Sequence, residues 1–279
     1  MVLSSTAESY QGLSKAFRTM APSVGITIRF VFEFEQTDVD SNDLDPAVFD
    51  QMRKTRTRVV IALGYDRNMK RIALQAWDLG LMAKGWAWIG PGDILAAEAA
   101  KLDNSQKGQR IEDAKRAFSG WLYFVLDAPV SLEFSKEVLN RSVSDFNVSV
   151  TIQPSQLHPG ATAMYDAVML WARACTDLTL QECKENTGNI VFERMKNVSF
   201  LGKSGYVKLD ANGDLIPPSF AVCNYVRSER YNGTQIVYTM SSKVVGRYQT
   251  ANKSYATTNL AIVWPGEVTT QPSDTGSPR

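Results

Sequence analysis

Side chains that commonly carry enzyme chemistry are scarce in this sequence. His158 is the only histidine, so any triad or dyad with an imidazole base would depend on it. It precedes Pro159-Gly160 at the expected start of a helix, and the neighbouring sequence supplies no nucleophile or carboxylate to pair with it. We therefore favour a structural or surface role for His158 over a catalytic one.

Two short motifs are similar to ligand-binding loops but lack required residues. Gly202-Lys203-Ser204 matches the end of a phosphate-binding P-loop, but Asn197 occupies the position of the first glycine. Asp210–Asp214 has the spacing of a calcium loop, but Leu215 and Ala221 stand where glycine and the bidentate glutamate belong. We interpret both as turns, and the sequence predicts no nucleotide site, no metal site, no cofactor and no catalytic residue.

The cysteines allow at most one disulfide. There are three of them, which is too few for a disulfide scaffold, and no Cys-x-x-Cys spacing indicates zinc. Cys175 and Cys183 could close a short loop in an oxidising compartment. Equally, Cys175 could be buried on a helix face while Cys183 is free.

Five N-x-[ST] sequons favour a secreted protein, because oligosaccharides are added to exposed asparagines in the secretory pathway. We expect most of these side chains to be exposed: Asn140, Asn147, Asn197, Asn232 and Asn252. The N-terminal residues lack the features of a signal peptide, so the protein is either cytosolic or begins upstream.

Composition excludes several classes of function. The 30 basic and 29 acidic residues are balanced, which gives no reason to expect a nucleic-acid or anionic-lipid partner. No run of about 18 apolar residues is present, so membrane attachment would require parts outside this chain. The hydrophobic content of 44% is enough for a substantial core.

The first 90 residues alternate between strand and helix patterns, which predicts a parallel sheet covered on both faces. The expected strands are residues 1–5, 26–34, 59–63 and 86–89, and the expected helices are 8–20, 46–54 and 69–79. Asp45-Pro46 is expected to cap the second helix. Glu33 and Glu35 lie on one face of the second strand, which is typical of a solvated edge.

The later residues combine helices with β structure. We expect a strand at 121–126, helices at 130–146 and 161–175, a strand from Phe200 followed by an Asn212-Gly213 turn, and strands at 220–226, 235–240 and 260–264. Residues 265–279 are expected to form a solvated linker.

Small, hydroxyl-bearing and acidic residues follow three of the predicted strands. They are Ser4-Ser5-Thr6, Gly64-Tyr65-Asp66 and Gly90–Asp93. In open parallel sheets, ligands bind at the carboxyl ends of the strands. These residues therefore either contact a polar ligand or form ordinary strand-to-helix turns.

Several motifs follow one another in a familiar order. They are Thr6–Phe17, Arg58–Leu63, Ala76–Gly80, Trp86–Gly90, Tyr165-Asp166-Ala167-Val168, Asn197–Asp214 and Val263–Gly266. Together they resemble the ligand-binding region of class C and natriuretic-peptide-type receptors, whose fold is similar to that of type I periplasmic binding proteins. The resemblance implies two α/β lobes that close on a ligand.

The resemblance also implies how the domains are divided. Residues 1–128 would form the first part of lobe 2, 129–214 the C-terminal part of lobe 1, 215–266 the return to lobe 2, and 267–279 a linker tail. The first half of lobe 1 would be absent. Apolar side chains that would pack against it are therefore expected to be exposed: Val168, Trp171, Phe192 and Met195.

The ligand site implied by the resemblance lies at the carboxyl edge of the lobe 2 sheet, where the sequence places Ser5, Thr6, Tyr10, Tyr65 and Asp93. Tyr10 matches a ligand-contacting tyrosine of amino-acid-sensing relatives, and Asp93 would receive a cationic group. Because a cleft residue contributes little to the core, replacing Tyr10 with alanine is expected to abolish binding without unfolding the domain.

The implied function is that of the extracellular domain of a cell-membrane receptor, which binds a small molecule or peptide and is not itself an enzyme. The complete receptor would be a possible homodimer, with a signalling domain beyond residue 279. The alternative is a soluble substrate-binding protein of an amino-acid or amide uptake system. A membrane span with a cyclase, kinase or seven-helix region in the full gene would distinguish the receptor.

Overall fold

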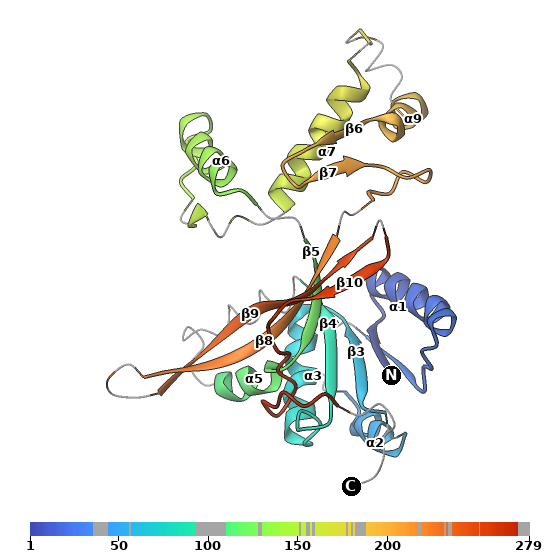
Figure 1. The fold of residues 1–279 in the computed structure, drawn as a ribbon, viewed down its shortest axis with the longest axis vertical. Helices are drawn as coiled ribbons and strands as arrows, with labels where there is room; N and C mark the ends of the chain where they lie inside the picture. The colour runs from blue at the N-terminus through green and yellow to red at the C-terminus, as the bar shows by residue number, and fades with distance from the viewer. Residues whose placement is uncertain are drawn as a thin grey trace. The chain divides into compact units, whose positions relative to one another are not determined.

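The computed structural model describes residues 1–35, 44–55, 57–92, 110–127, 130–150, 152–154, 157, 160–176, 178–179, 181, 188–216, 219–231, 233, 236–250 and 252–272. The chain forms two compact units (Figure 1). Unit 1 comprises Met1–Val125, Ala221–Arg247 and Ala256–Arg279, and unit 2 comprises Leu126–Phe220 and Tyr248–Tyr255.

Unit 1 is built from alternating strands and helices, followed by a group of strands. In chain order the elements are β1 (Val2–Ser5), α1 (Glu8–Met20), the 3-10 helix η1 (Ala21–Val24), β2 (Val31–Phe34), α2 (Pro46–Lys54), β3 (Val59–Leu63), α3 (Asp66–Asp78), β4 (Ala87–Pro91), α5 (Ile111–Phe118), β5 (Leu122–Leu126), β8 (Ser219–Tyr231), β9 (Ile236–Gln249) and β10 (Ser254–Thr257). The residue ranges of the last four strands extend past the bounds of this unit.

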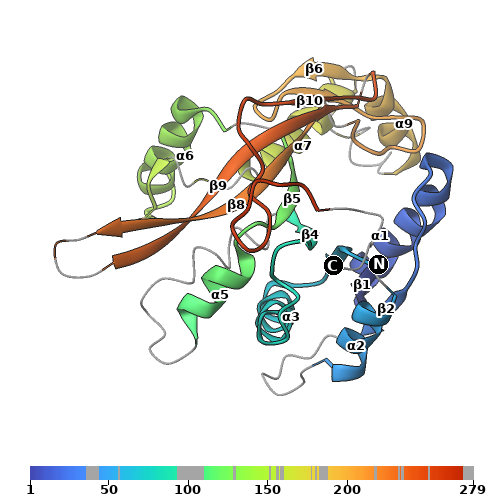
Figure 2. The ribbon, with the colours of Figure 1, turned by 60° about the horizontal axis from the view of Figure 1, so that its bottom comes forward.

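These strands form an eight-stranded sheet in the order β10-β9-β8-β5-β4-β3-β1-β2. The five strands from β2 to β5 in this order run parallel. Backbone bonds from Tyr225 to Trp121 and from Asp127 to Ser219 pair β8 with β5 in the antiparallel sense. The paired strands β8 and β9 form a long ribbon (Figures 1 and 2). This mostly parallel sheet confirms the predicted α/β class.

Local sequence signals explain where several elements begin and end. The Asp45 side chain accepts a hydrogen bond from the Ala47 N–H at 2.9 Å, and Pro46 opens α2, so the predicted cap is confirmed. The apolar run of β3 has the predicted bounds. Gly80 lies just beyond α3 with φ +72, a conformation that favours glycine after a helix.

The two faces of the unit 1 sheet are covered differently. One face carries the main apolar core, in which α2, α3 and α5 pack on alternate strand residues such as Leu3, Val60 and Tyr123. On the other face, α1 covers Val2 and Leu63. Further along that face, Ile262 and Trp264 of the C-terminal segment pack over Leu122, Val222 and Val245.

The C-terminal segment is fixed by side-chain and backbone contacts in place of strand pairing. Asn224 is fully buried, and its amide donates to the Trp121 and Val263 carbonyls and accepts from the Val263 N–H. Gly120 lies so close to Pro265 that a Cβ atom there would fall 2.3 Å from the Pro265 nitrogen. The Asn224 side chain therefore makes the hydrogen bonds to Val263 that the backbone of a neighbouring strand would otherwise make.

Two predicted strands differ from the structure for physical reasons. Residues 260–264 do not form a strand, because Val263 bonds to Asn224, although Trp264 makes an isolated bridge to Val268. The second predicted strand begins at Val31 instead of Ile26, because its partner β1 begins only at Val2. The short strand β10 was not predicted.

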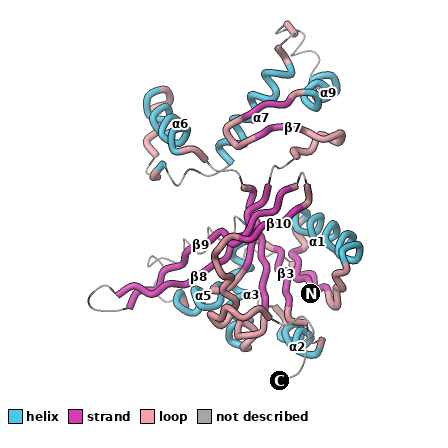
Figure 3. The backbone as a smooth tube through the Cα atoms, in the orientation of Figure 1, coloured by secondary structure: helices cyan, strands magenta, loops and turns pink. Residues whose placement is uncertain are grey.

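Unit 2 contains the helices α6 (Leu132–Ser144), α7 (Gly160–Ala174) and α9 (Asn189–Asn197), and the antiparallel pair β6 (Ser199–Leu201) and β7 (Tyr206–Lys208) (Figure 3). Its described core is small: Leu170, Phe200, Val207 and Leu209, with three partly buried neighbours. The expected turn follows β7, where Gly213 has φ +90.

Helix α7 of unit 2 has apolar side chains on the face opposite its packed face. Its packed face carries residues spaced four apart: Thr162, Asp166, Leu170 and Ala174. On the opposite face, Met164 is 74% exposed, Val168 65% and Trp171 46%. Phe192 of α9 is also exposed, as predicted, whereas Met195 packs against the small core.

Candidate ligand-binding site

The order of the parallel strands defines a topological switch point in unit 1. β1 lies between β2 and β3, so the connection through α1 leads one way along the sheet and the later connections lead the other way. Accordingly, α1 packs on one face, while α2, α3 and α5 pack on the other. In open α/β sheets, ligands bind outside the carboxyl ends of the strands at such a point. The candidate site therefore lies where β1 and β3 end.

The serines at the end of β1 stabilise the turn into α1. Both side chains are fully buried. Ser4 Oγ lies 3.2 Å from the Ser5 carbonyl oxygen and 3.3 Å from that of Tyr10, and Ser5 Oγ accepts a bond from the Ala7 N–H at 3.2 Å. The next residue, Thr6, is half-buried and anchored to β2 by its N–H. Ser5 is thus a positioning residue of the turn, and Thr6 is nearer to solvent.

Tyr10 and Tyr65 meet across the switch point. Their ring centroids are 4.9 Å apart and the rings are nearly perpendicular, an edge-to-face contact. Tyr10 is only 8% exposed and packs with Val2 and Leu63, whereas Tyr65 is 38% exposed. The expectation that Tyr10 contributes little to the core is therefore wrong. Tyr65 is the more accessible aromatic ring of the pair.

Ser9 is a residue of this region that sequence reasoning missed. Its hydroxyl lies 3.4 Å from the Tyr65 hydroxyl, and its side chain is exposed. Ala7 caps α1 without a side-chain acceptor, so first-turn N–H groups face the same end of the sheet. Ser9 could have been found from the sequence, because it lies in the first turn of the helix that follows β1.

At the end of β4, the backbone at Gly92 lies very close to the neighbouring strand β5. A Cβ atom at Gly92 would lie 1.9 Å from the Phe124 carbonyl oxygen, so only glycine fits this close approach to β5. Asp93, the predicted partner of a cationic group, lies outside the described residues. Four of the five predicted residues are described, and they follow β1 and β3 or belong to α1: Ser5, Thr6, Tyr10 and Tyr65.

An open groove of about 600 Å³ lies elsewhere in unit 1, between α1 and β2. It is lined by Gln11, Lys15, Arg18, Thr19 and Glu33. Arg18 Nη1 lies 3.6 Å from Glu33 Oε1. None of the predicted ligand-binding residues lines this groove. Its exposed, polar walls give it no enclosed surface for a small ligand.

The P-loop-like turn of unit 2 is occupied by the chain's own carboxylate. Asp166 of α7 is 2% exposed and accepts bonds of 2.7 Å from the N–H groups of Lys203 and Ser204. A Cβ atom at Gly202 would lie 2.4 Å from Asp166 Oδ1. The backbone donors that would hold a phosphate are thus already bonded, which agrees with the interpretation of this motif as a turn.

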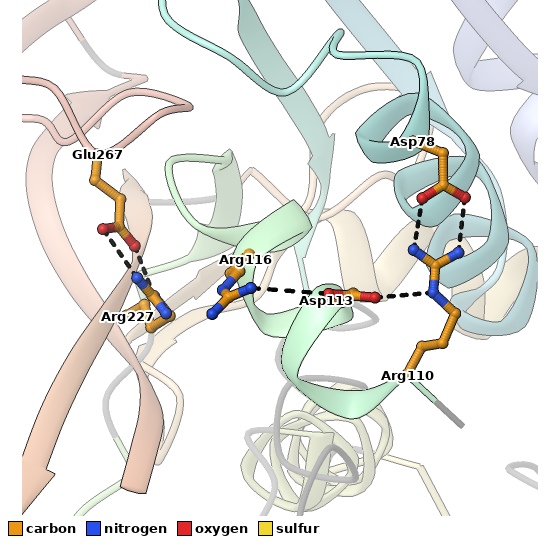
Figure 4. A network of polar contacts seen from close by, with 6 residues as sticks. All are labelled: Asp78, Arg110, Asp113, Arg116, Arg227 and Glu267. Atoms are coloured by element: carbon orange, nitrogen blue, oxygen red, sulfur yellow. Dashed lines mark hydrogen bonds and ion pairs between the residues drawn. The ribbon is translucent and has the colours of Figure 1, made fainter. Parts of the chain in front are cut away.

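Two clusters of charged side chains on the surface of unit 1 are paired (Figure 4). Arg110 donates two bonds to Asp78, at 2.7 and 2.5 Å, and one to Asp113 at 2.9 Å. The hydrogen bond from Arg110 lowers the pKa of Asp78. Arg227 donates to Glu267 at 2.6 and 3.1 Å, and this bond lowers the pKa of Glu267. Each cluster joins surface elements that are distant in the sequence.

The remaining predicted residues are placed as follows. Asn140, Asn147, Asn197 and Asn252 are exposed, as expected of glycan acceptors. Asn232, Cys183 and His158 lie outside the described residues. Cys175 takes part in a disulfide and Cys223 is a buried thiol outside any disulfide, while the specific pairing of Cys175 with Cys183 stays a prediction.

The described ranges contain neither a candidate membrane span nor a candidate metal site. No helix there is long and apolar enough to cross a membrane. No group of His, Cys, Asp or Glu side chains in the described part of the chain could hold a metal ion.

Comparison with known proteins gives consistent matches. The family described as "Receptor family ligand binding region" matches residues 1–228. Similar curated proteins are receptor-type guanylate cyclase gcy-28 of Caenorhabditis elegans (25% identical over 167 residues), glutamate receptor 3.1 of Oryza sativa subsp. japonica (27% over 95) and atrial natriuretic peptide receptor 2 of Anguilla japonica (28% over 138). The alignments cover 57%, 30% and 50% of this chain, but only 13%, 10% and 11% of those proteins.

Proposed function

The chain belongs to the receptor ligand-binding region family, whose periplasmic-binding-protein-like fold its mostly parallel sheet fits, and from this we propose that it is the ligand-binding part of a membrane signalling receptor. The similar proteins named as receptors favour this function over the alternative of a soluble uptake protein. We propose that the ligand is a small molecule or peptide. Signalling would then be carried out by another part of the complete protein.

We place the ligand at the carboxyl ends of β1 and β3. The observation that carries this proposal is the strand order β2-β1-β3, which puts a switch point there and brings Tyr65 against Tyr10. Ser5 and Tyr10 are buried, so they would position the neighbouring site residues and not contact the ligand themselves. Thr6, Ser9 and Tyr65 are the more accessible side chains and would contact the ligand.

These groups suit a polar ligand with one anionic or carbonyl end. Hydroxyls of Thr6, Ser9 and Tyr65 both donate and accept hydrogen bonds. The first turn of α1 supplies N–H donors and the positive end of the helix dipole, which favour a carboxylate. The exposed ring of Tyr65 would stack on an apolar or cationic group. Asp93 remains our proposed partner for an amine.

The receptor proposal includes an extracellular location and glycosylation. The four described sequon asparagines are exposed and all belong to unit 2. Expression in a eukaryotic secretory host should therefore give a chain whose mass falls after glycosidase treatment. An unchanged mass would count against the extracellular location.

The ligand site is tested by a panel of free amino acids, simple amines and short peptides in a thermal-shift assay. A compound that binds only the folded chain raises the free energy of unfolding by RT ln(1 + L/Kd), where L is the concentration of the compound, so the unfolding temperature rises with that concentration. We expect at least one compound to stabilise the chain, and Tyr65→Ala to remove this effect. Tyr65→Phe separates the hydroxyl from the ring. Stabilisation that is equal in the wild type and Tyr65→Ala would refute the placement.

A further inference from the structure

We propose that N-linked glycans on Asn197 and Asn252 cover two open strand edges of this chain and keep them from pairing with strands of other proteins. The inference rests on the extracellular location proposed above, and it gives two of the sequons a specific role. An exposed edge strand presents unpaired N–H and C=O groups, which are a template for aggregation. Folded proteins protect such edges with charged side chains or by covering them.

Four of the described strands lie at the edge of a sheet, and only two of them carry a charge. β2 and β10 are the outermost strands of the eight-stranded sheet, and β6 and β7 form a sheet of two strands. β2 contains Glu33, and β7 contains Lys208. β6 (Ser-Phe-Leu) and β10 (Ser-Tyr-Ala-Thr) contain no charged residue. These two strands therefore lack the usual protection of an edge.

Each of the two uncharged edge strands begins at the hydroxyl residue of a sequon. In Asn197-Val-Ser199 the serine is the first residue of β6, and in Asn252-Lys-Ser254 it is the first residue of β10. The remaining described sequons adjoin no described strand: Asn140 and Asn147. A glycan would thus be attached two residues before each strand that lacks a charge.

The backbone of β10 has hydrogen-bonding groups on its outer side. The short turn between β9 and β10 makes this pair antiparallel, and the N–H of Thr258, just past β10, donates to the Val245 carbonyl at 2.9 Å. Alternate residues bond in such a pair, so Tyr255 and Thr257 present their N–H and C=O groups outward. All four side chains of β10 are exposed. The outer edge of β10 is therefore accessible to another strand.

The same alternation applies to β6. It pairs with β7 in the antiparallel sense, and the Gly202 N–H donates to the Gly205 carbonyl at 2.7 Å. Ser199 and Leu201 therefore present their backbone groups away from β7. The Leu201 side chain is 81% exposed, which adds an apolar contact for an incoming strand. β6 is thus a second edge that a glycan would protect.

Local hydrogen bonds hold both asparagines close to these strands. Asn252 Oδ1 accepts bonds from the Ser254 N–H at 3.2 Å and from its hydroxyl at 2.7 Å. These bonds use the amide oxygen, whereas a glycan is attached to the amide nitrogen. Asn197 Nδ2 donates to the Glu193 carbonyl at 3.1 Å, which uses one of its two hydrogens. A strand of four residues spans about 13 Å, so a bulky oligosaccharide attached two residues away is large enough to cover it.

Single-glycan variants of the whole chain, expressed in a eukaryotic secretory host, test the proposal. Asn197→Gln and Asn252→Gln each remove one glycan beside an edge strand, and Asn140→Gln is the matched control because its glycan would lie on a helix. Light scattering below the unfolding midpoint measures aggregation. We expect it to be several-fold faster in Asn197→Gln and Asn252→Gln than in the wild type, and unchanged in Asn140→Gln.

A charge placed on β10 separates the cover of the edge from a general effect of glycans on solubility. Thr257→Lys added to Asn252→Gln should restore slow aggregation, because a lysine protects an edge strand without a glycan. Ser254→Ala should behave as Asn252→Gln does, whereas Ser254→Thr keeps the sequon and should behave as the wild type. Equal aggregation in Asn197→Gln, Asn252→Gln and Asn140→Gln would overturn the proposal, as would a failure of Thr257→Lys to restore slow aggregation.

Glycopeptide mass spectrometry of the wild type distinguishes a failure of this inference from a failure of the proposed location. Sugar on Asn140 or Asn147 but on neither Asn197 nor Asn252 would overturn the edge-covering role and leave the extracellular location intact. Sugar at no site would overturn both. The proposal predicts sugar on Asn197 and Asn252.

Discussion

The carboxylate of Asp166 accepts hydrogen bonds from both the N–H and the hydroxyl of Ser204, at 2.7 and 2.5 Å. These two residues connect α7 to the turn between β6 and β7, although they are 38 positions apart. Lys203 donates a third bond to the same carboxylate. Asp166 thus holds this turn against α7 within unit 2. Hydrogen-bond donors of Lys203 and Ser204 stabilise its negative charge.

Removing the charge of Asp166 should destabilise unit 2. An asparagine cannot accept all of these bonds, because one of its two polar atoms is a donor. We expect Asp166→Asn to cost about 1.5–3 kcal/mol of unfolding free energy, the range for hydrogen bonds to charged groups. Ser204→Ala, which keeps the N–H bond, should cost less. Denaturant titration measures both, and equal stability of wild type and Asp166→Asn would contradict this role.

The glycine that approaches Asp166 should tolerate no side chain. At Gly202 an added Cβ would lie 2.4 Å from the carboxylate, whereas at Gly12 of α1 nothing lies within 4 Å. Gly202→Ala should therefore lower the thermal unfolding midpoint of unit 2. Gly12→Ala should stabilise the chain by up to about 1 kcal/mol through helix propensity. If Gly202→Ala and Gly12→Ala changed the unfolding midpoint in the same direction and by the same amount, the close contact at Gly202 would not explain the effect.

The two tyrosines at the switch point should differ in their effect on stability. Tyr10 is buried in a core cluster, so Tyr10→Ala should cost about 3 kcal/mol, as for other large-to-small core changes. Tyr65 is more exposed, and Tyr65→Ala should cost about 1 kcal/mol, the value of an edge-to-face pair. Equilibrium unfolding measures both. A larger loss for Tyr65→Ala would reverse the assignment of structural and ligand-facing roles.

The C-terminal segment should loosen on acidification. Arg227 lowers the pKa of Glu267 below its ordinary value of 4.5, so the folded state binds this proton less readily than the unfolded state. The stabilisation is therefore fully present above pH 4.5 and is lost as the pH falls through the lowered pKa. The protection factors of the amides of residues 262–268 in hydrogen exchange, which correct for the intrinsic pH dependence of exchange, should fall over this range. Glu267→Gln should show no such pH-dependent loss of protection. A loss of protection in Glu267→Gln as large as that of the wild type would contradict the assignment.

Unit 1 should be more resistant to local unfolding than unit 2. Unit 1 has a large apolar core with three helices on one face of the sheet, whereas the described core of unit 2 is small and α7 exposes Met164, Val168 and Trp171. Regions with few buried apolar contacts open more easily. In limited proteolysis unit 2 should be cleaved before unit 1, and its amides should exchange faster. Uniform protection over residues 1–92 and 130–210 would contradict this difference.

Local patterns in the sequence predicted most of unit 1. The apolar run of β3 and the Asp45-Pro46 cap of α2 each depend on adjacent residues, so their bounds could be predicted. The burial of Tyr10 could not, because the ring that covers it comes from Tyr65, far away in the sequence. The conformation of residues 260–264 was also missed, since it depends on the buried amide of Asn224.

The candidate site was predicted only in part. The residues that follow β1 and β3 were identified because parallel strands end at a common edge. The switch point itself required the strand order, which depends on pairing between distant segments. Ser9 was missed, since a serine in the first turn of a helix is ordinarily interpreted as a helix-start residue.

The central claim is that a ligand binds where β1 and β3 end. The most direct measurement is a hydrogen-exchange footprint of the wild-type chain with and without the most stabilising compound of the panel. We predict that protection increases at residues 6–10 and around Tyr65 and is unchanged along the groove residues Lys15 and Arg18. Protection confined to that groove, or to unit 2 alone, would contradict the proposed site.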